Sequence, residues 1–152
     1  MIPEAEGATP YGIFSLADAY LYAAKDTLAN TRKLTGGPTR LLCYHACELY
    51  LKAFLRERGE DIPTLRAYGH DLAAMLASAE SKGLNPARKA AVAISEAVDR
   101  NDYVRVRYMV VEVETDFTVD QVMALAERIR ACVRHALGFE EFGTTVLYAP
   151  PA

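Results

Sequence analysis

The chain has 152 residues, of which 51% are hydrophobic and 24% charged, and its formal net charge is −3. These values are typical of one globular domain, and they exclude a wholly disordered chain, a collagen and a broadly basic nucleic-acid-binding protein, though not a local basic patch. No apolar run approaches the roughly 20 residues of a membrane span, and residues 1–10 lack the features of a secretory signal. We therefore expect a cytoplasmic protein without a membrane contact.

The apolar periodicity predicts an all-α fold, an up-and-down bundle of about five helices joined by short loops. A flexible arm over residues 1–10 precedes the bundle at 11–138, and a tail follows at 139–152. The five predicted helices run from near Ser15 to the Gly36-Gly37-Pro38 break, from about Pro38 to Arg58, from a cap at His70 or Asp71 to Gly83, from the Asn85-Pro86 pair onward, and from a capping box at Thr118 and Gln121 to Gly138. The cysteines Cys43, Cys47 and Cys132 are expected to be reduced thiols that serve as small core residues.

One segment is ambiguous between a strand and an extended connector. From Tyr103 to Thr115, valine and tyrosine alternate with arginine at a period of two, which is typical of a strand. A second β-prone piece lies at residues 145–148. The sequence thus allows a short β-prone segment at 104–113 that pairs with 145–148, although two isolated strands are marginally stable.

The second predicted helix is apolar around most of its circumference, which predicts a central core helix. One polar seam remains on it, formed by His45, Glu48, Lys52 and Arg56. His45 and Glu48 have the spacing of metal ligands, and a full metal site would borrow His70 or Asp71 from the next helix. Zinc sites need three or four ligands, however, and HEXXH is absent. We interpret the seam as a structural or interface feature and predict no metal and no cofactor.

Three further groups are candidates for chemistry. Gly69-His70-Asp71-Leu72 could supply a His–Asp acid/base pair, but adjacent helical residues diverge by about 100°, so helix capping is the better interpretation. On the last helix, arginine could hold a phosphate and histidine could shuttle a proton, and the candidates are Arg128, Arg130 and His135. Aromatic rings that stack bases and arginines that bind phosphates could be supplied by Arg100, Tyr103, Arg105, Arg107 and Tyr108. With a net charge of −3, the favoured interpretation of this group is an edge segment whose tyrosines pack on the bundle.

Common catalytic signatures are missing from the chain. G-x-S-x-G, G-x-x-x-x-G-K and G-x-G-x-x-G do not occur, which removes the commonest hydrolases, ATPases and dehydrogenases from consideration.

Three stretches of the sequence resemble the HEPN domain family. They are YHACELYLKAFLRERG, LRAYGHDLAAMLASAESKGL and YVRVRY, and the resemblance extends from about Leu16 to Leu137. It implies an all-α bundle that is often a homodimer. It also implies one of two roles, a metal-independent endoribonuclease or a binding module, in toxin–antitoxin or defence systems.

Active members of this family resemble one another in an R-x4-6-H motif, usually with a polar residue after the arginine, and two motifs meet across a dimer. Here Arg128 or Arg130 with His135 has the spacing, but Ile129 and Ala131 follow the arginines. We therefore predict a dimeric binding module linked to RNA or nucleotides, with a nucleotidyltransferase-type partner, and keep the endoribonuclease as the alternative. Its predicted binding residues are His45, Glu48, Lys52, His70, Arg105, Arg107 and Tyr108.

Overall fold

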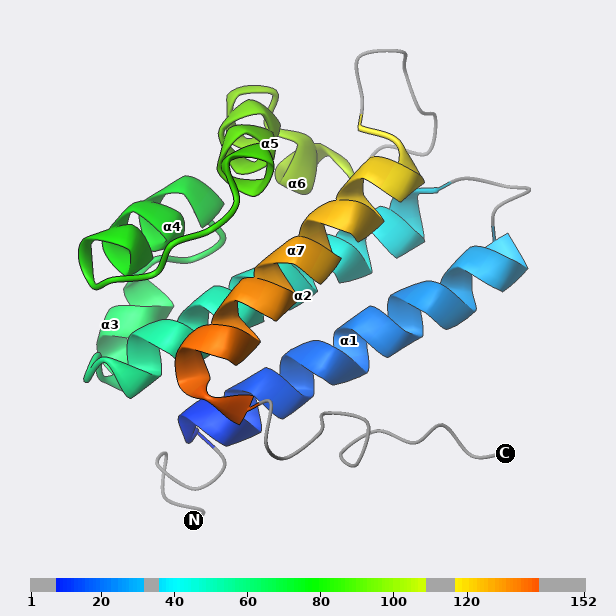
Figure 1. Ribbon diagram of the computed structural model, residues 1–152. Helices are drawn as coiled ribbons and strands as arrows, with labels where there is room; N and C mark the ends of the chain where they lie inside the picture. The colour runs from blue at the N-terminus through cyan, green and yellow to red at the C-terminus, as the bar shows by residue number, and fades with distance from the viewer. Residues whose placement is uncertain (1–7, 32–35, 109–116, 140–152) are drawn as a thin grey trace, which may run out of the picture.

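The computed structural model describes residues 8–31, 36–108 and 117–139, and over these residues it is all-α, as predicted (Figure 1). Five longer helices and two short ones make up the described part of the chain. They are α1 (Pro10–Thr31), α2 (Gly37–Glu57), α3 (Ile62–Ala67), α4 (Leu72–Ser81), α5 (Arg88–Asp99), α6 (Asp102–Arg105) and α7 (Val119–Leu137). Among the described residues, no helix is long and apolar enough to cross a membrane.

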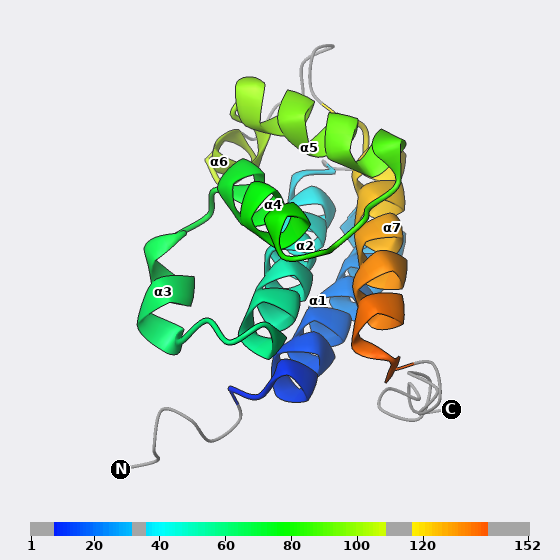
Figure 2. The same cartoon turned by 60° about the vertical axis from the view of Figure 1, so that its left-hand side comes forward.

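Helix α2 is the centre of the bundle. Helices α1, α2 and α7 run side by side along the molecule, and α3 to α6 cover the side of α2 that α1 leaves open (Figures 1 and 2). Tyr44, Tyr50 and Phe54 of α2 are fully buried, together with Cys43 and Cys47. A helix that is apolar on nearly all sides must be packed all round, so the prediction of a core helix is confirmed.

Two buried carboxylates tie this core helix to its neighbours. Asp18 of α1 accepts hydrogen bonds from Tyr50 of α2 and from Arg130 of α7, whose Nε lies 2.7 Å from Asp18 Oδ1. Asp102 of α6 accepts from Tyr44 and pairs with Arg40, both on α2, the second at 3.4 Å. Because a buried carboxylate without partners is costly, each cluster fixes how its helices meet.

Of the two interpretations left open for 104–113, a short strand or an extended connector, neither holds over the residues that the structure describes. Asp102–Arg105 form the short helix α6, and turns continue to Tyr108. In a strand, Val104 and Val106 would share one face, but Val104 is 42% exposed while Val106 is buried. The buried pairing of Asp102 outweighs the local alternation. Residues 109–113 and 145–148 lie outside the described residues.

The ends of the helices test the capping signals that the sequence analysis used. The capping box of Thr118 and Gln121 and the left-handed Gly138, with φ of 70°, are both confirmed. Helix α1 begins five residues before the predicted Ser15, because Thr9 Oγ1 accepts the Gly12 N–H.

One other predicted start needs correction. Helix α5 begins at Arg88 rather than at the Asn85-Pro86 pair, with Ala87 as its N-cap. At α4 the cap is Asp71, one of the two residues predicted for it. The connector before it also contains α3, which the sequence did not predict.

Candidate polar binding site on the core helix

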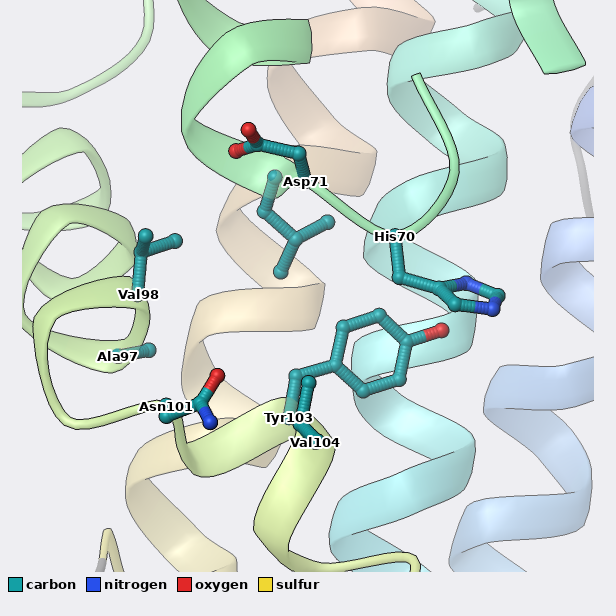
Figure 3. A pocket seen from close by; sticks show the side chains of 8 residues that line it. His70, Asp71, Ala97, Val98, Asn101, Tyr103 and Val104 are labelled. Carbon is teal, nitrogen blue, oxygen red and sulfur yellow. The ribbon is translucent and has the colours of Figure 1, made fainter. Parts of the chain in front are cut away.

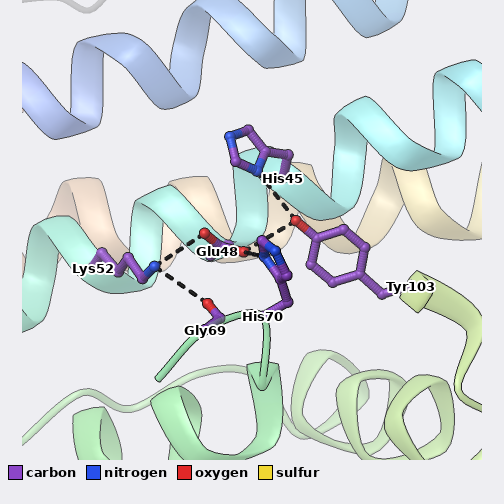
Figure 4. Close-up of polar contacts among 6 residues, drawn as sticks. All are labelled: His45, Glu48, Lys52, Gly69, His70 and Tyr103. Atoms are coloured by element: carbon purple, nitrogen blue, oxygen red, sulfur yellow. Dashed lines mark hydrogen bonds and ion pairs between the residues drawn. The ribbon is translucent and has the colours of Figure 1, made fainter. Parts of the chain in front are cut away.

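Glu48 of α2 is the centre of a polar cluster. Its side chain is 4% exposed, and its two oxygens accept from three side chains. His70 Nδ1 lies 2.6 Å and the Tyr103 hydroxyl 3.1 Å from Oε1, while Lys52 Nζ lies 3.0 Å from Oε2 (Figure 4). A buried carboxylate is acceptable only when donors surround it, and α2, α6 and the loop before α4 supply them here.

His45 extends the cluster through Tyr103. Its Nδ1 lies 3.1 Å from the Tyr103 hydroxyl, which donates its single proton to the acceptor-only Glu48. His45 Nδ1 must therefore carry a proton and donate to the hydroxyl. The His45 ring also packs edge-on against Tyr20 of α1, with ring centroids 4.4 Å apart. The cluster thus reaches α1 as well.

The surroundings of the cluster keep Glu48 charged and His45 neutral. Burial would raise the pKa of Glu48, but the hydrogen bond from His70 and the charge of Lys52 outweigh it, so the pKa lies below its ordinary 4.5. Burial lowers the pKa of His45 below its ordinary 6.5, against the opposing charge of Glu48. Burial, with Glu48 adding to it, raises the pKa of Tyr103 well above its usual range. Near neutral pH the cluster is therefore a carboxylate, a phenol and a neutral His45.

Tyr103 joins this cluster to a pocket. Its ring stacks on Tyr44 at 5.2 Å between centroids, and the Arg107 guanidinium carbon lies 4.7 Å from the ring centroid. The ring also forms one wall of a pocket of about 290 Å³ between α4, α5 and α6 (Figure 3). His70 is among the residues that line the pocket, but its imidazole ring points away from the pocket, past the Tyr103 ring.

The structure brings together four of the predicted binding residues, His45, Glu48, Lys52 and His70. The seam's remaining member, Arg56, lies apart from them and donates to the Ala8 and Glu60 carbonyls.

Sequence reasoning did not assign Tyr103 to this cluster. The local signal is Asn101 two residues earlier, because asparagine adopts the left-handed conformation more readily than most residues, and here it is the N-cap of α6 with φ of 56°. Of the other predicted binding residues, Arg107 packs on Tyr103, Arg105 is half-buried and Tyr108 is 78% exposed.

His70 and Asp71 have separate tasks. Gly69, with φ of +57°, turns the chain so that His70 reaches Glu48, and the Gly69 carbonyl accepts from Lys52 at 3.3 Å. Asp71 Oδ1 accepts the Ala74 N–H at 3.0 Å and caps α4. The two side chains therefore do not form an acid/base pair. Half of the capping interpretation is confirmed, for Asp71 alone.

The cluster does not have the composition of a metal centre. Within residues 8–31, 36–108 and 117–139, no group of three or more His, Cys, Asp and Glu side chains could hold a metal ion. Lys52 occupies one Glu48 oxygen, and His70 with Tyr103 occupies the other. The two Glu48 oxygens and the Nδ1 atoms of His45 and His70 are thus engaged in internal hydrogen bonds.

The candidate catalytic residues of α7 lie on two different flanks of that helix. Arg130 faces α1 and donates from two nitrogens to Asp18, at 2.7 and 3.3 Å. Arg128 is exposed and lines a groove between α5 and α7. His135 is also exposed, seven residues after Arg128, a spacing that places both on one flank about 10 Å apart along the axis. The helix therefore groups His135 with Arg128 and not with Arg130.

Comparison with known proteins gives one match. The model of the HEPN domain family matches residues 15–136, which is most of the chain. No curated protein and no solved structure matches.

Replacing Glu48 by Gln tests the charge of the cluster. At neutral pH we expect Glu48→Gln to lower the free energy of unfolding by about 1 to 3 kcal/mol, because His70 and Lys52 lose a charged acceptor. Since the folded-state pKa of Glu48 is lowered, its stabilisation is complete above the ordinary 4.5 and is lost as the pH falls through the folded-state value. The difference between the two proteins in urea unfolding should therefore shrink in acid.

Glu57→Gln, at an exposed position of the same helix, is the matched control and should change stability little at any pH. A difference between wild type and Glu48→Gln that stayed constant down to about pH 3.5 would contradict the charged state of Glu48.

Proposed function

The chain belongs to the HEPN domain family, and on this premise we propose that it is a binding module for RNA or nucleotides rather than a nuclease. The observation that carries the proposal is the position of Tyr103, whose ring borders an apolar pocket while Arg107 packs on it at 4.7 Å. Proteins bind single-stranded RNA by combining a pocket or ring for the base with arginines for the phosphate.

The cluster around Glu48 supports this role by holding Tyr103 in place. The hydroxyl is bound by both Glu48 and His45, and the ring is backed by Tyr44, so the pocket wall is rigid before any ligand arrives. A preorganised wall avoids part of the entropy cost of binding. Because the whole chain carries a net charge of −3, its contact with a phosphate must be local and sensitive to salt.

The pairing of Arg130 also favours binding over catalysis. Asp18 is completely buried, and Arg130 and Tyr50 are its hydrogen-bond donors. Turning Arg130 toward a scissile phosphate would leave a buried carboxylate with one donor fewer, which is strongly unfavourable. Arg130 is thus better explained as a structural residue that joins α7 to α1.

Binding can be measured by fluorescence anisotropy with a labelled single-stranded oligoribonucleotide of adenine, cytosine and uracil. We expect Arg107→Ala to weaken binding by about three- to tenfold, because one phosphate contact is lost. The slope of the logarithm of the binding constant against the logarithm of the salt concentration should become shallower by about one.

Arg66→Ala removes the same charge from an exposed position on α3, away from the pocket and from the groove between α5 and α7, and is the control. Equal effects of the two variants, or the absence of any binding by wild type, would refute the proposal.

A second candidate, the metal-independent endoribonuclease, is favoured by the shared flank of Arg128 and His135. Arg128 lines the groove between α5 and α7, whose volume is about 790 Å³. In that mechanism Arg128 would hold the phosphate and His135 would act as general acid or base.

If the protein is an endoribonuclease, wild type should cleave RNA in the presence of EDTA. The His135→Ala variant should then cleave it about a hundredfold or more slowly. Arg134→Ala, which removes a neighbouring cation from the other flank of α7, should cleave like wild type. Equal cleavage by wild type and His135→Ala would eliminate this candidate.

We also propose that the protein forms a homodimer through the same groove. Its wall includes Val92, an exposed apolar side chain at 44% accessibility, and the apolar residues Ala93 and Leu125. A toxin–antitoxin or defence setting and a nucleotidyltransferase-type partner stay predictions from the family resemblance.

Sedimentation should give twice the 16.7 kDa of one chain, and Val92→Glu should shift the protein toward monomer by placing a charge in the interface. A strict monomer at high concentration would contradict the dimer.

A further inference from the structure

The pocket beside Tyr103 has a composition that selects its ligand. Its buried floor consists of Leu72, Ala97 and the Tyr103 ring, and its exposed rim includes Val98 and Val104. Its volume of about 290 Å³ is enough for one nucleobase. A narrow apolar space between an aromatic ring and valines favours a flat, neutral body.

Two polar side chains stand at opposite ends of this pocket. Asp71 lies at the α4 end and Asn101 at the turn between α5 and α6, with Val98 on one side and Tyr103 on the other (Figure 3). The Asp71 carboxylate accepts hydrogen bonds only, whereas the Asn101 amide can both donate and accept. The pocket therefore presents a pure acceptor at one end and an adaptable amide at the other.

The lining residues argue against a phosphate or carboxylate ligand inside the pocket. Apart from His70, whose imidazole is bonded to Glu48 outside the pocket, none of the lining side chains is cationic. The carboxylate of Asp71 would repel an anion. The charged part of a nucleotide must thus remain outside the pocket.

We propose that this pocket binds the base of a guanine nucleotide, free or within single-stranded RNA, an inference that rests on the proposed binding function. The carboxylate of Asp71 accepts from guanine N1–H and from the exocyclic N2 amine. The amide of Asn101 donates to O6 or N7 on the opposite edge, and the base lies between Tyr103 and Val98.

Guanine is the base that satisfies both ends at once. It carries two adjacent donors on one edge and two acceptors on the other, which matches a carboxylate facing an amide. Adenine offers its N6 amine, but the ring nitrogens on either side of that amine, N1 and N7, are acceptors that a carboxylate repels. Uracil flanks its single N3–H with two carbonyls, which a carboxylate repels. Cytosine offers an amine, but the ring nitrogen and carbonyl beside it are acceptors.

Asp71 can serve the helix and the ligand together. Its Oδ1 accepts the Ala74 N–H as the cap of α4, and a carboxylate has further lone pairs on both oxygens for the base. Asn101 has φ of 56°, a left-handed conformation that asparagine adopts more readily than most residues and glycine adopts freely. Both positions therefore permit substitutions that leave the backbone unchanged.

The test uses the full chain and calorimetric titration with the 5′-monophosphates of guanosine, adenosine, cytidine and uridine. Wild type should bind guanosine monophosphate about tenfold or more tightly than the other three. Asp71→Asn keeps the cap, since asparagine caps as well as aspartate, and it should abolish this preference by weakening guanosine monophosphate alone. Asn101→Gly should weaken guanosine monophosphate by about three- to tenfold.

Asp61→Asn is the matched control, because Asp61 caps α3 through the Thr64 N–H in the same way and does not line the pocket. It should bind all four nucleotides as wild type does. Equal affinity of wild type for the four nucleotides, or a guanine preference that survives Asp71→Asn, would overturn the inference.

Oligoribonucleotides separate this inference from the proposed function and separate the two sources of the base. If a guanine-free strand binds but one added guanine brings no gain that depends on Asp71, the guanine pocket is wrong while RNA binding stands. If guanosine monophosphate binds through Asp71 and RNA does not, the ligand is a free nucleotide. If neither the strands nor the nucleotides bind, both proposals fail.

Discussion

The burial of α2 on nearly every side is the constraint on which the rest of the structure depends. Where such a helix is covered, a polar group on its surface, or against it, needs a partner from a neighbouring element. Among the residues that the structure describes, the buried carboxylates of Asp18, Glu48 and Asp102 meet this condition. Each is a point at which another helix must arrive in one orientation, so the polar contacts specify a packing that apolar contacts alone would leave less defined.

The same constraint explains why four of the predicted binding residues lie together. Glu48 can remain charged inside the bundle only by drawing His70, Lys52 and Tyr103 toward it, and Tyr103 then becomes the wall of a pocket. The cluster is therefore a support and the pocket is the exposed feature that it supports.

Local signals in the sequence predicted the long helices well, because apolar periodicity, Thr118 with Gln121, and Gly138 act within a few residues. They also placed His45, Glu48 and Lys52 on one seam, since that follows from helical spacing alone. The role of Tyr103 depends instead on contacts with α2, more than fifty positions away along the chain. The alternation around Arg105 and Arg107 allowed a strand. The helix forms instead because Asp102 binds Arg40 and Tyr44 of α2, contacts between distant positions that local sequence patterns do not contain. For the same reason, the attachment of Arg130 to Asp18 was not foreseen.

The central position of α2 also has a consequence for how the molecule opens. Its neighbours α1, α4 and α7 all pack on it, so its backbone amides can exchange with solvent only when the bundle as a whole comes apart. Helix α3 packs lightly on the end of α2, with Leu65 as its buried residue, and can detach at far lower cost. Amides of α2 should thus exchange slowly and report global unfolding, whereas those of α3 should exchange faster. The loop that carries His70 follows α3, so local opening of α3 would reach the edge of the polar cluster without unfolding α2.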